Sequence, residues 1–263
     1  MKKLSKIISL SLCLSFFFSI SSFAADTAVV TDVHNEFSIM NETLESTVIH
    51  KDTLDDVIAS VENEYDITTN MPTEVIKELS SVAEVSKEEQ WLDETHLQVS
   101  YNLIPKNPII EKTFKSGNTE EIYSITNYTY VMNLSNSSGS QTDTSVQSDV
   151  TLKNTVYYSY YDNGSVRMLK IDYGTTTITR FLESNLRNLV LNVLGQGVSD
   201  SSYSDESNSR TIPTPYVNSN YSLRSNFNHY YHTGAAKILY GSAVTYSHGN
   251  SSYTARAQIS LGN

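Results

Sequence analysis

The spacing of apolar residues changes near residue 97, and this change constrains the fold more than any other feature of the 263-residue sequence. Between residues 54 and 65, and again between 75 and 85, apolar residues recur every three or four positions, which is typical of helices with one buried face. From 97 to 103 they alternate with polar residues, which is typical of a half-buried strand. The sequence therefore predicts an α+β protein in which the helices come first.

Charge and tyrosine content divide the chain at the same point. Residues 25–96 hold 18 acidic side chains against three lysines, whereas residues 97–263 hold 12 basic and 11 acidic side chains. Tyr65 is the only one of the 18 tyrosines that precedes residue 97. We therefore expect an acidic helical region at 25–96 and a β domain at 97–263. Because phosphates would be repelled, the acidic excess argues against nucleic acid and anionic membranes as partners of this region.

The first 24 residues have the three parts of a secretory signal peptide. Lysines at positions 2, 3 and 6 precede an uncharged run at 7–20, and the small residues Ser22 and Ala24 occupy the positions that a signal peptidase reads. We expect cleavage after Ala24 and a secreted, extracellular protein. The only cysteine, Cys13, lies in this segment, so the mature chain can form no disulfide and no cysteine–metal site.

The β domain is predicted to be mostly antiparallel. Strand-like alternation recurs along it, with serine, threonine and asparagine on the polar side. Residues 181–194 instead carry apolar side chains at helical spacing, and Gly195 follows them. We therefore expect an acidic N-terminal helical region followed by an antiparallel β-sandwich or partly open barrel with one inserted helix.

Two hairpins can be placed in register from the sequence. Asn163-Gly164 is a preferred pair for a two-residue turn, which would put Tyr158 opposite Leu169 on the buried face. The second hairpin joins residues 238–246 to residues 253–261.

The sequence lacks the motifs that catalysis most often uses. It contains no phosphate-binding loop, no Gly-x-Gly-x-x-Gly fingerprint, no Gly-x-Ser-x-Gly elbow and no His-Glu-x-x-His helix. The closest histidine pair, His229 and His232, would point to opposite sides of a strand and has no evident third ligand. We expect a non-catalytic protein without metal or cofactor, and a secreted hydrolase is a further alternative.

Tyrosine pairs are the features that point most directly to binding. The pairs at 157–158 and 160–161 put two tyrosines on each face of one strand, and the pair at 230–231 does the same in a loop. Exposed tyrosine offers rigid, amphipathic contact area, although tyrosine could equally fill the core of a domain with few phenylalanines. The predicted ligand-binding residues are Tyr157, Tyr161, Tyr230 and Tyr231.

Two functional classes are compatible with these observations. The first is a secreted binding or interaction module that holds surface polysaccharide or another protein. The second is a β-barrel pore former, because two strand-like arms within 122–161 flank a middle rich in serine, threonine and glutamine. Residues 140–150 lack regular apolar alternation, which argues against the pore. A membrane is a partner only in this alternative.

Overall fold

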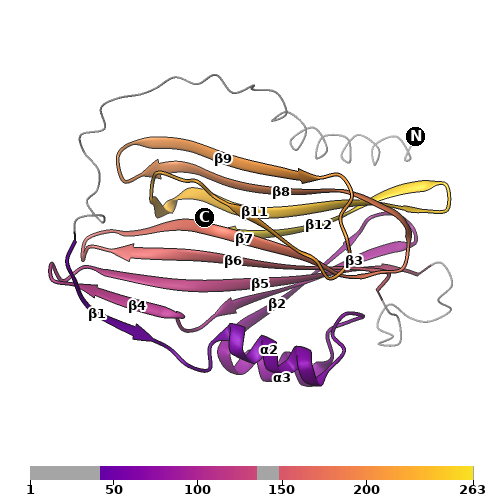
Figure 1. Ribbon diagram of the computed structural model, residues 1–263, viewed down its shortest axis with the longest axis horizontal. Helices are drawn as coiled ribbons and strands as arrows, with labels where there is room; N and C mark the ends of the chain where they lie inside the picture. Colours follow the sequence, from indigo (N-terminus) through magenta and orange to yellow (C-terminus); the bar gives the residue numbers. More distant parts are fainter. Residues whose placement is uncertain (1–41, 135–147, 263) are drawn as a thin grey trace, which may run out of the picture. The chain divides into compact units, whose positions relative to one another are not determined.

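A computed structural model describes residues 42–134 and 148–262. The predicted signal peptide, with Cys13, and most of the polar stretch between 133 and 148 lie outside the described residues. The described chain is mostly β, with two helices and one open sheet of 12 strands in which every pair is antiparallel (Figure 1). Within these ranges, no helix is long and apolar enough to cross a membrane.

The elements follow one another in a simple order. They are β1 (Leu44–Ile49), α2 (Leu54–Glu64), α3 (Thr73–Val82), β2 (Ala83–Trp91), β3 (His96–Pro105), β4 (Ile110–Phe114), β5 (Thr119–Asn133), β6 (Val150–Asp162), β7 (Arg167–Phe181), β8 (Ser184–Ser199), β9 (Tyr203–Ile212), β10 (Asn220–Arg224), β11 (Tyr231–His248) and β12 (Ser251–Leu261).

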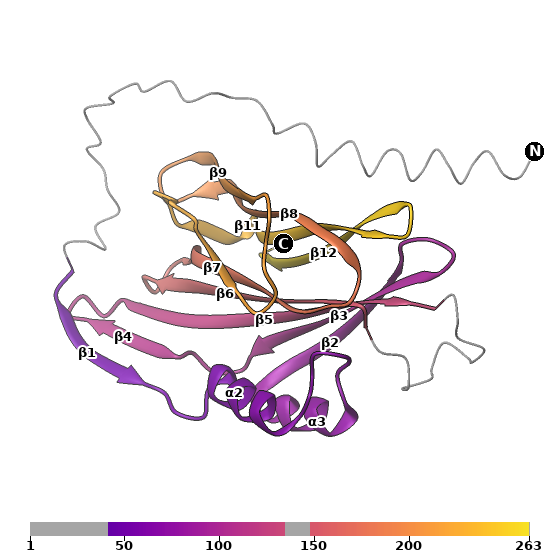
Figure 2. The same cartoon turned by 45° about the vertical axis from the view of Figure 1, so that its right-hand side comes forward.

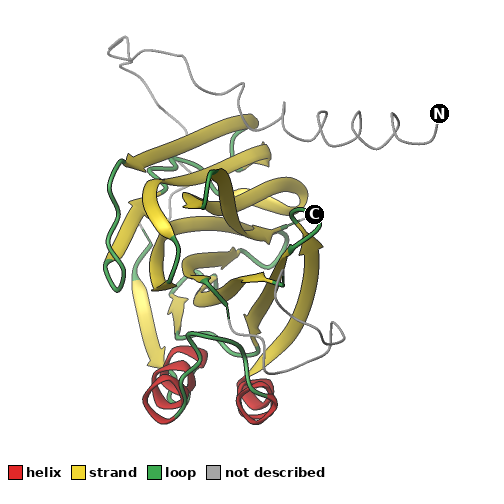
Figure 3. Cartoon of the chain, turned by 90° about the vertical axis from the view of Figure 1, so that its right-hand side faces the viewer, coloured by secondary structure: helices red, strands yellow, loops and turns green. Residues whose placement is uncertain are grey.

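Helices α2 and α3 lie where the apolar spacing predicts helices, and both cover one face of the sheet (Figure 3). The first begins at a capping box, in which the Thr53 backbone N–H donates to the Asp56 carboxylate at 2.9 Å. The apolar stripes of both helices join β3 and β5 in one buried cluster. Its fully enclosed members include Val61, Val75, Leu79, Leu103, Tyr128 and Tyr130.

Much of the predicted acidic helical region is not helical. Helix α3 ends at Val82, and the next nine residues form β2, which pairs with β3 from Ala83↔Pro105 to Trp91↔Leu97. The predicted helical region is also wrong near its start for the described residues, because Leu44–Ile49 forms β1. In both segments backbone pairing with a neighbouring strand outweighs the helical spacing of a few apolar residues.

The inserted helix predicted at 181–194 is wrong as well, because residues 184–194 belong to β8. This strand pairs with β11 on one side and β9 on the other, and its buried residues alternate at 189, 191 and 193. Asn185 and Asn188 adopt left-handed φ angles of 54° and 51°, near register shifts in the pairing with β11. These irregularities break the alternation of period two and produce the helix-like spacing in the sequence.

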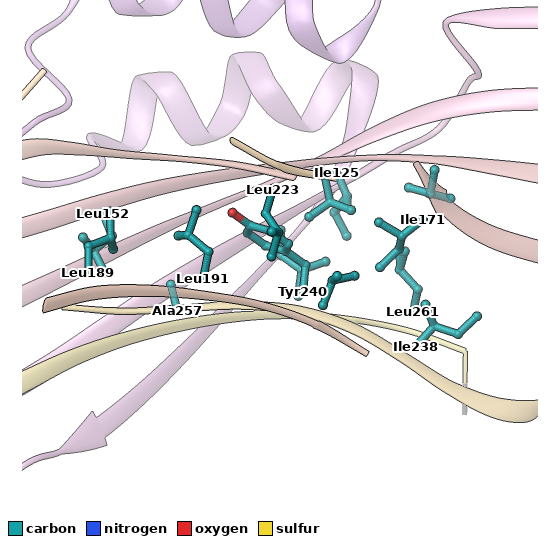
Figure 4. Close-up of a cluster of buried hydrophobic side chains, with 14 of the residues drawn as sticks. Ile125, Leu152, Ile171, Leu189, Leu191, Leu223, Ile238, Tyr240, Ala257 and Leu261 are labelled. Atoms are coloured by element: carbon teal, nitrogen blue, oxygen red, sulfur yellow. The ribbon is translucent and has the colours of Figure 1, made fainter. Parts of the chain in front are cut away.

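The main core lies on the side of β5, β6 and β7 opposite to the helices. Figure 2 shows β8, β9, β11 and β12 on that side, and Figure 4 shows the buried side chains between the two layers of strands. The residues labelled there, which come from both layers, are Ile125, Leu152, Ile171, Leu189, Leu191, Leu223, Ile238, Tyr240, Ala257 and Leu261.

The two predicted hairpins differ in outcome. The C-terminal hairpin is confirmed, since Tyr240 pairs with Ile259 and Tyr246 with Tyr253. In the β6–β7 hairpin the turn spans four residues, 163–166, rather than two. Leu169 therefore pairs with Tyr160 and not with Tyr158, although it keeps the predicted buried face.

Replacement of Leu169 by alanine is expected to lower the free energy of unfolding by about 2–5 kcal/mol, because Leu169 is fully buried in the main core. Denaturant unfolding of the two proteins measures this loss. Arg167→Ala is the control: this exposed side chain pairs with Glu121 at 2.6 Å, and its loss should cost less than about 1 kcal/mol. An unchanged midpoint for Leu169→Ala would contradict the assigned face.

A fragment that begins at Leu97 is expected to unfold at a lower temperature than the full chain. The predicted boundary at 96/97 crosses the cluster shared by the helices, β3 and β5, so truncation would expose Tyr128 and Tyr130. Thermal melting of both proteins checks this. A fragment with an unchanged midpoint would show that 25–96 folds as a separate region.

Candidate functional site

The side of β6 that faces away from the main core carries most of the predicted site. Tyr158 points into the main core, whereas the hydroxyl of Tyr157 reaches Asp55 of α2 on the opposite side. We call this opposite side the tyrosine face. Its members on β6 and β7 are Tyr157, Ser159, Tyr161, Lys170, Asp172 and Tyr173.

A bulge in β7 gives the tyrosine face its composition. Tyr158 pairs with Ile171 but Tyr157 pairs with Tyr173, so that Asp172 is an extra residue on β7. The alternation of β7 predicts that Tyr173 shares the buried face of Ile171; this is wrong, because the extra residue turns Tyr173 outward. The Asp172 carboxylate accepts a hydrogen bond from the Ser159 hydroxyl at 2.7 Å.

Tyr157 and Tyr173 form the exposed part of this face. Their rings stack with centroids 4.5 Å apart and planes 17° apart, and Tyr173 is 37% exposed. The Tyr157 hydroxyl donates to Asp55 at 3.2 Å, and the same carboxylate accepts from the Ser124 hydroxyl at 2.6 Å. Burial, and then the charge of Asp55, raises the pKa of Tyr157 well above its ordinary value. The pair is therefore a fixed, neutral aromatic surface.

Tyr161 and Tyr230 meet at the other end of the face, with ring centroids 6.1 Å apart. Tyr161 is buried: its hydroxyl donates to Glu42 at 2.9 Å and accepts from the Asn118 amide at 2.7 Å. Burial and then Glu42 raise the pKa of Tyr161 to about 12. This tyrosine is covered by the segment that precedes β1.

Tyr230 is half-buried among charged side chains. Its hydroxyl donates to Glu120 at 3.2 Å, and Glu120 also forms an ion pair with Lys112 at 2.6 Å. The Lys170 ammonium lies 5.5 Å from the Tyr230 ring centroid, within the range of a cation–π contact. Tyr230 therefore has a carboxylate at its hydroxyl and an ammonium over its ring.

Tyr231 lies on the opposite side of the sheet and is fully buried in the main core. Its ring contacts Phe227 and packs against Gly195. A Cβ added at Gly195 would lie 2.7 Å from a carbon of the Tyr231 ring. Its hydroxyl lies 2.9 Å from the Glu206 carboxylate. The structure thus brings Tyr161 and Tyr230 together, places Tyr157 on the same face, and separates Tyr231 from all three.

Several residues of the face were not predicted from the sequence. Tyr173 is hidden by the bulge, which alternation alone does not reveal. Asp55 belongs to an acidic helix in which no carboxylate stands out, and Arg224 comes from β10, which pairs with β7 at Tyr173.

Among residues 42–134 and 148–262, no cluster of three or more histidine or acidic side chains could hold a metal ion.

Comparison with known proteins gives no relative. No protein-family model matches the chain, and neither a curated protein nor a solved structure is significantly similar to it. The site must therefore be interpreted from its own geometry.

Replacement of Asp172 by asparagine is expected to raise the melting temperature at neutral pH. Burial raises the pKa of Asp172 above its ordinary value, although the Ser159 hydroxyl and Lys170 oppose this. A carboxyl with a raised pKa in the folded protein destabilises it as pH rises through the ordinary value of about 3.9. The melting temperature of the asparagine variant should therefore rise relative to that of the parent protein between pH 3 and pH 7.

Thermal unfolding at several pH values measures this difference. Glu94→Gln, at an exposed carboxylate, is the matched control and should give no such gain. A parallel pH dependence of Asp172→Asn and the parent protein would show that Asp172 is not responsible.

Proposed function

We propose that the chain is a secreted, non-catalytic binding protein whose tyrosine face holds surface polysaccharide or another protein. On this view the two layers of strands act as a sandwich-like scaffold for that face. The observation that carries the proposal is the Tyr157–Tyr173 stack, an aromatic pair that is ordered and yet partly exposed. Exposed aromatic surface of this kind is typical of binding sites.

The geometry of the stack suits binding for a physical reason. Each ring is held by the other, and Tyr157 is also held by its bond to Asp55, so little conformational freedom is left to lose when a ligand binds. Asp55 on one side and Arg224 on the other supply hydrogen-bonding groups next to the apolar rings. A flat ligand with hydroxyl or amide groups at its edge matches this combination.

The other predicted residues would contribute differently. Tyr230 is partly exposed and lies among Glu120, Lys112 and Lys170, so it extends the face with charged groups. Tyr161 is buried beneath Glu42, and its ring packs against the ring of Tyr230. On this view Tyr157 makes the main contact with the ligand.

Pore formation is the alternative. The arms of the 122–161 hairpin are β5 and β6. Strand β5 is packed on both faces, with Tyr128 against the helices and Ile125 in the main core, and Val156 of β6 also lies in the main core. Insertion into a bilayer would have to disrupt both clusters at once. The energetic cost of that step favours the binding function.

Alanine at Tyr157 or Tyr173 is expected to weaken binding by about 1–2 kcal/mol, or roughly 5–30-fold in Kd, because truncation removes half of the stack. Binding of the mature protein to cell-wall polysaccharide and to an immobilised glycan panel provides the measurement. The matched control is Tyr203→Ala, which removes a tyrosine that is 67% exposed on β9.

Two results would contradict the proposal. Equal losses in the Tyr203 variant and the Tyr157 variant would show that the tyrosine face has no special part in binding. Dye release from lipid vesicles by the mature protein, without affinity for glycans or wall material, would establish the pore instead.

A further inference from the structure

Strand β1 is attached to the sheet in an unusual way. It stands at one end of the strand order and pairs only with β4, through residues 110–114. All six of its residues are exposed, including Val48 at 49% and Ile49 at 71%. Strands are normally stabilised by burying at least one face. Since β1 buries neither face, its side chains contribute almost nothing to its stability, and it depends on backbone hydrogen bonds.

The side chain of Glu42, just before β1, is an exception because it does contact the rest of the protein. Glu42 accepts hydrogen bonds from the Asn118 amide at 2.6 Å and from the hydroxyls of Tyr161 and Ser116 at 2.9 Å each. Burial alone would raise the pKa of Glu42, but these three hydrogen bonds outweigh it and lower the pKa below its ordinary value. The segment is therefore held by a backbone ladder and a single carboxylate.

A short hinge joins β1 to the rest of the chain. Four residues, 50–53, connect it to α2, and Asp52 among them has a left-handed φ of 56°. This conformation costs a residue other than glycine on the order of 1 kcal/mol. A rotation that brings Asp52 to a negative φ would relieve that strain. It would leave the two larger buried clusters intact, since β1 contributes to neither, and would remove Glu42 from Tyr161.

We propose that β1 exchanges between two copies of this chain, so that residues 42–49 of each copy pair with β4 of the other. A second copy is the partner that fits, because it alone supplies the same register on β4 together with a glutamate that reaches Tyr161 and Asn118. Exchange therefore preserves the contacts of the described residues 42–49, and among the described residues only the hinge changes. Tyr161 stays covered in the exchanged dimer, and the Tyr157–Tyr173 stack is unaffected.

Cysteine pairs can detect this exchange, since the mature chain contains no cysteine of its own. Ser46 is the register partner of Thr113, within reach of a disulfide only when β1 lies on β4. Ser46→Cys is made in one preparation and Thr113→Cys in another, the second with a size tag. The two form a mixed disulfide above the background of random collision only if one copy donates β1 to the other. The two preparations are mixed at high concentration, treated with oxidised glutathione and separated on a non-reducing gel.

We expect the mixed dimer to accumulate with time and protein concentration. Glu42→Ala, added to the copy with the Ser46→Cys substitution, should speed its formation several-fold, because it removes the carboxylate anchor. The control mixes Ser46→Cys with Thr211→Cys, an exposed position on β9, and should give only background. A second pair, Val48→Cys with Glu111→Cys, repeats the test in the same register. Mixed dimer at control level for both pairs would overturn the proposal.

Discussion

The pairing of β6 with both β5 and β7 is the constraint on which the rest of the structure depends. Along this strand β5 and β7 each keep a nearly continuous register, and β5 in turn holds β3 and β4 while β7 holds β10 and the start of β11. A buried amide fixes the position of the second layer: Asn154 accepts hydrogen bonds from Thr176 at 2.7 Å and Ser242 at 2.9 Å. Because a buried polar group is costly to leave unpaired, this network specifies how β11 lies over β6 and β7.

Both environments that the sequence left open for tyrosine, the buried core and the partly exposed surface, occur among the described residues. Tyr130 is enclosed and donates to the Ile67 carbonyl at 2.9 Å, and Tyr128 donates to Glu62 at 2.7 Å. These tyrosines replace phenylalanine in the core between helices and sheet, with their hydroxyls satisfied at its edge. Tyr173, by contrast, has its ring partly exposed. The count of tyrosines thus says little about which rings are exposed, whereas their position relative to the helices and the second layer decides it.

The parts of the fold that could be predicted from sequence are those in which local pattern and tertiary environment agree. The C-terminal hairpin has one clean apolar face, so that its register from residue 238 to residue 261 follows from alternation alone. Strand β8 could not be recognised, because Asn188 and the nearby register shifts interrupt its alternation. Strand β2 could not be recognised either, because its stability comes from pairing with β3 rather than from its own apolar residues. Tyr157 was singled out because it begins the tyrosine-rich run 157–161, whereas Tyr173 was missed because a single inserted residue changes its face.

The inserted residue, Asp172, is linked to the core through Gly174, two positions further along β7. Gly174 lies against the Tyr240 ring, where an added Cβ would come within 2.3 Å of a ring carbon, so no larger side chain fits beneath it. Gly174 therefore has to face the core opposite Val156, and the extra residue Asp172 supplies the change of register that puts it there. With Gly174 directed inward, Tyr173 must point outward and stack on Tyr157. The close packing of one core tyrosine against a glycine thereby determines the exposed aromatic pair on the other side of the sheet.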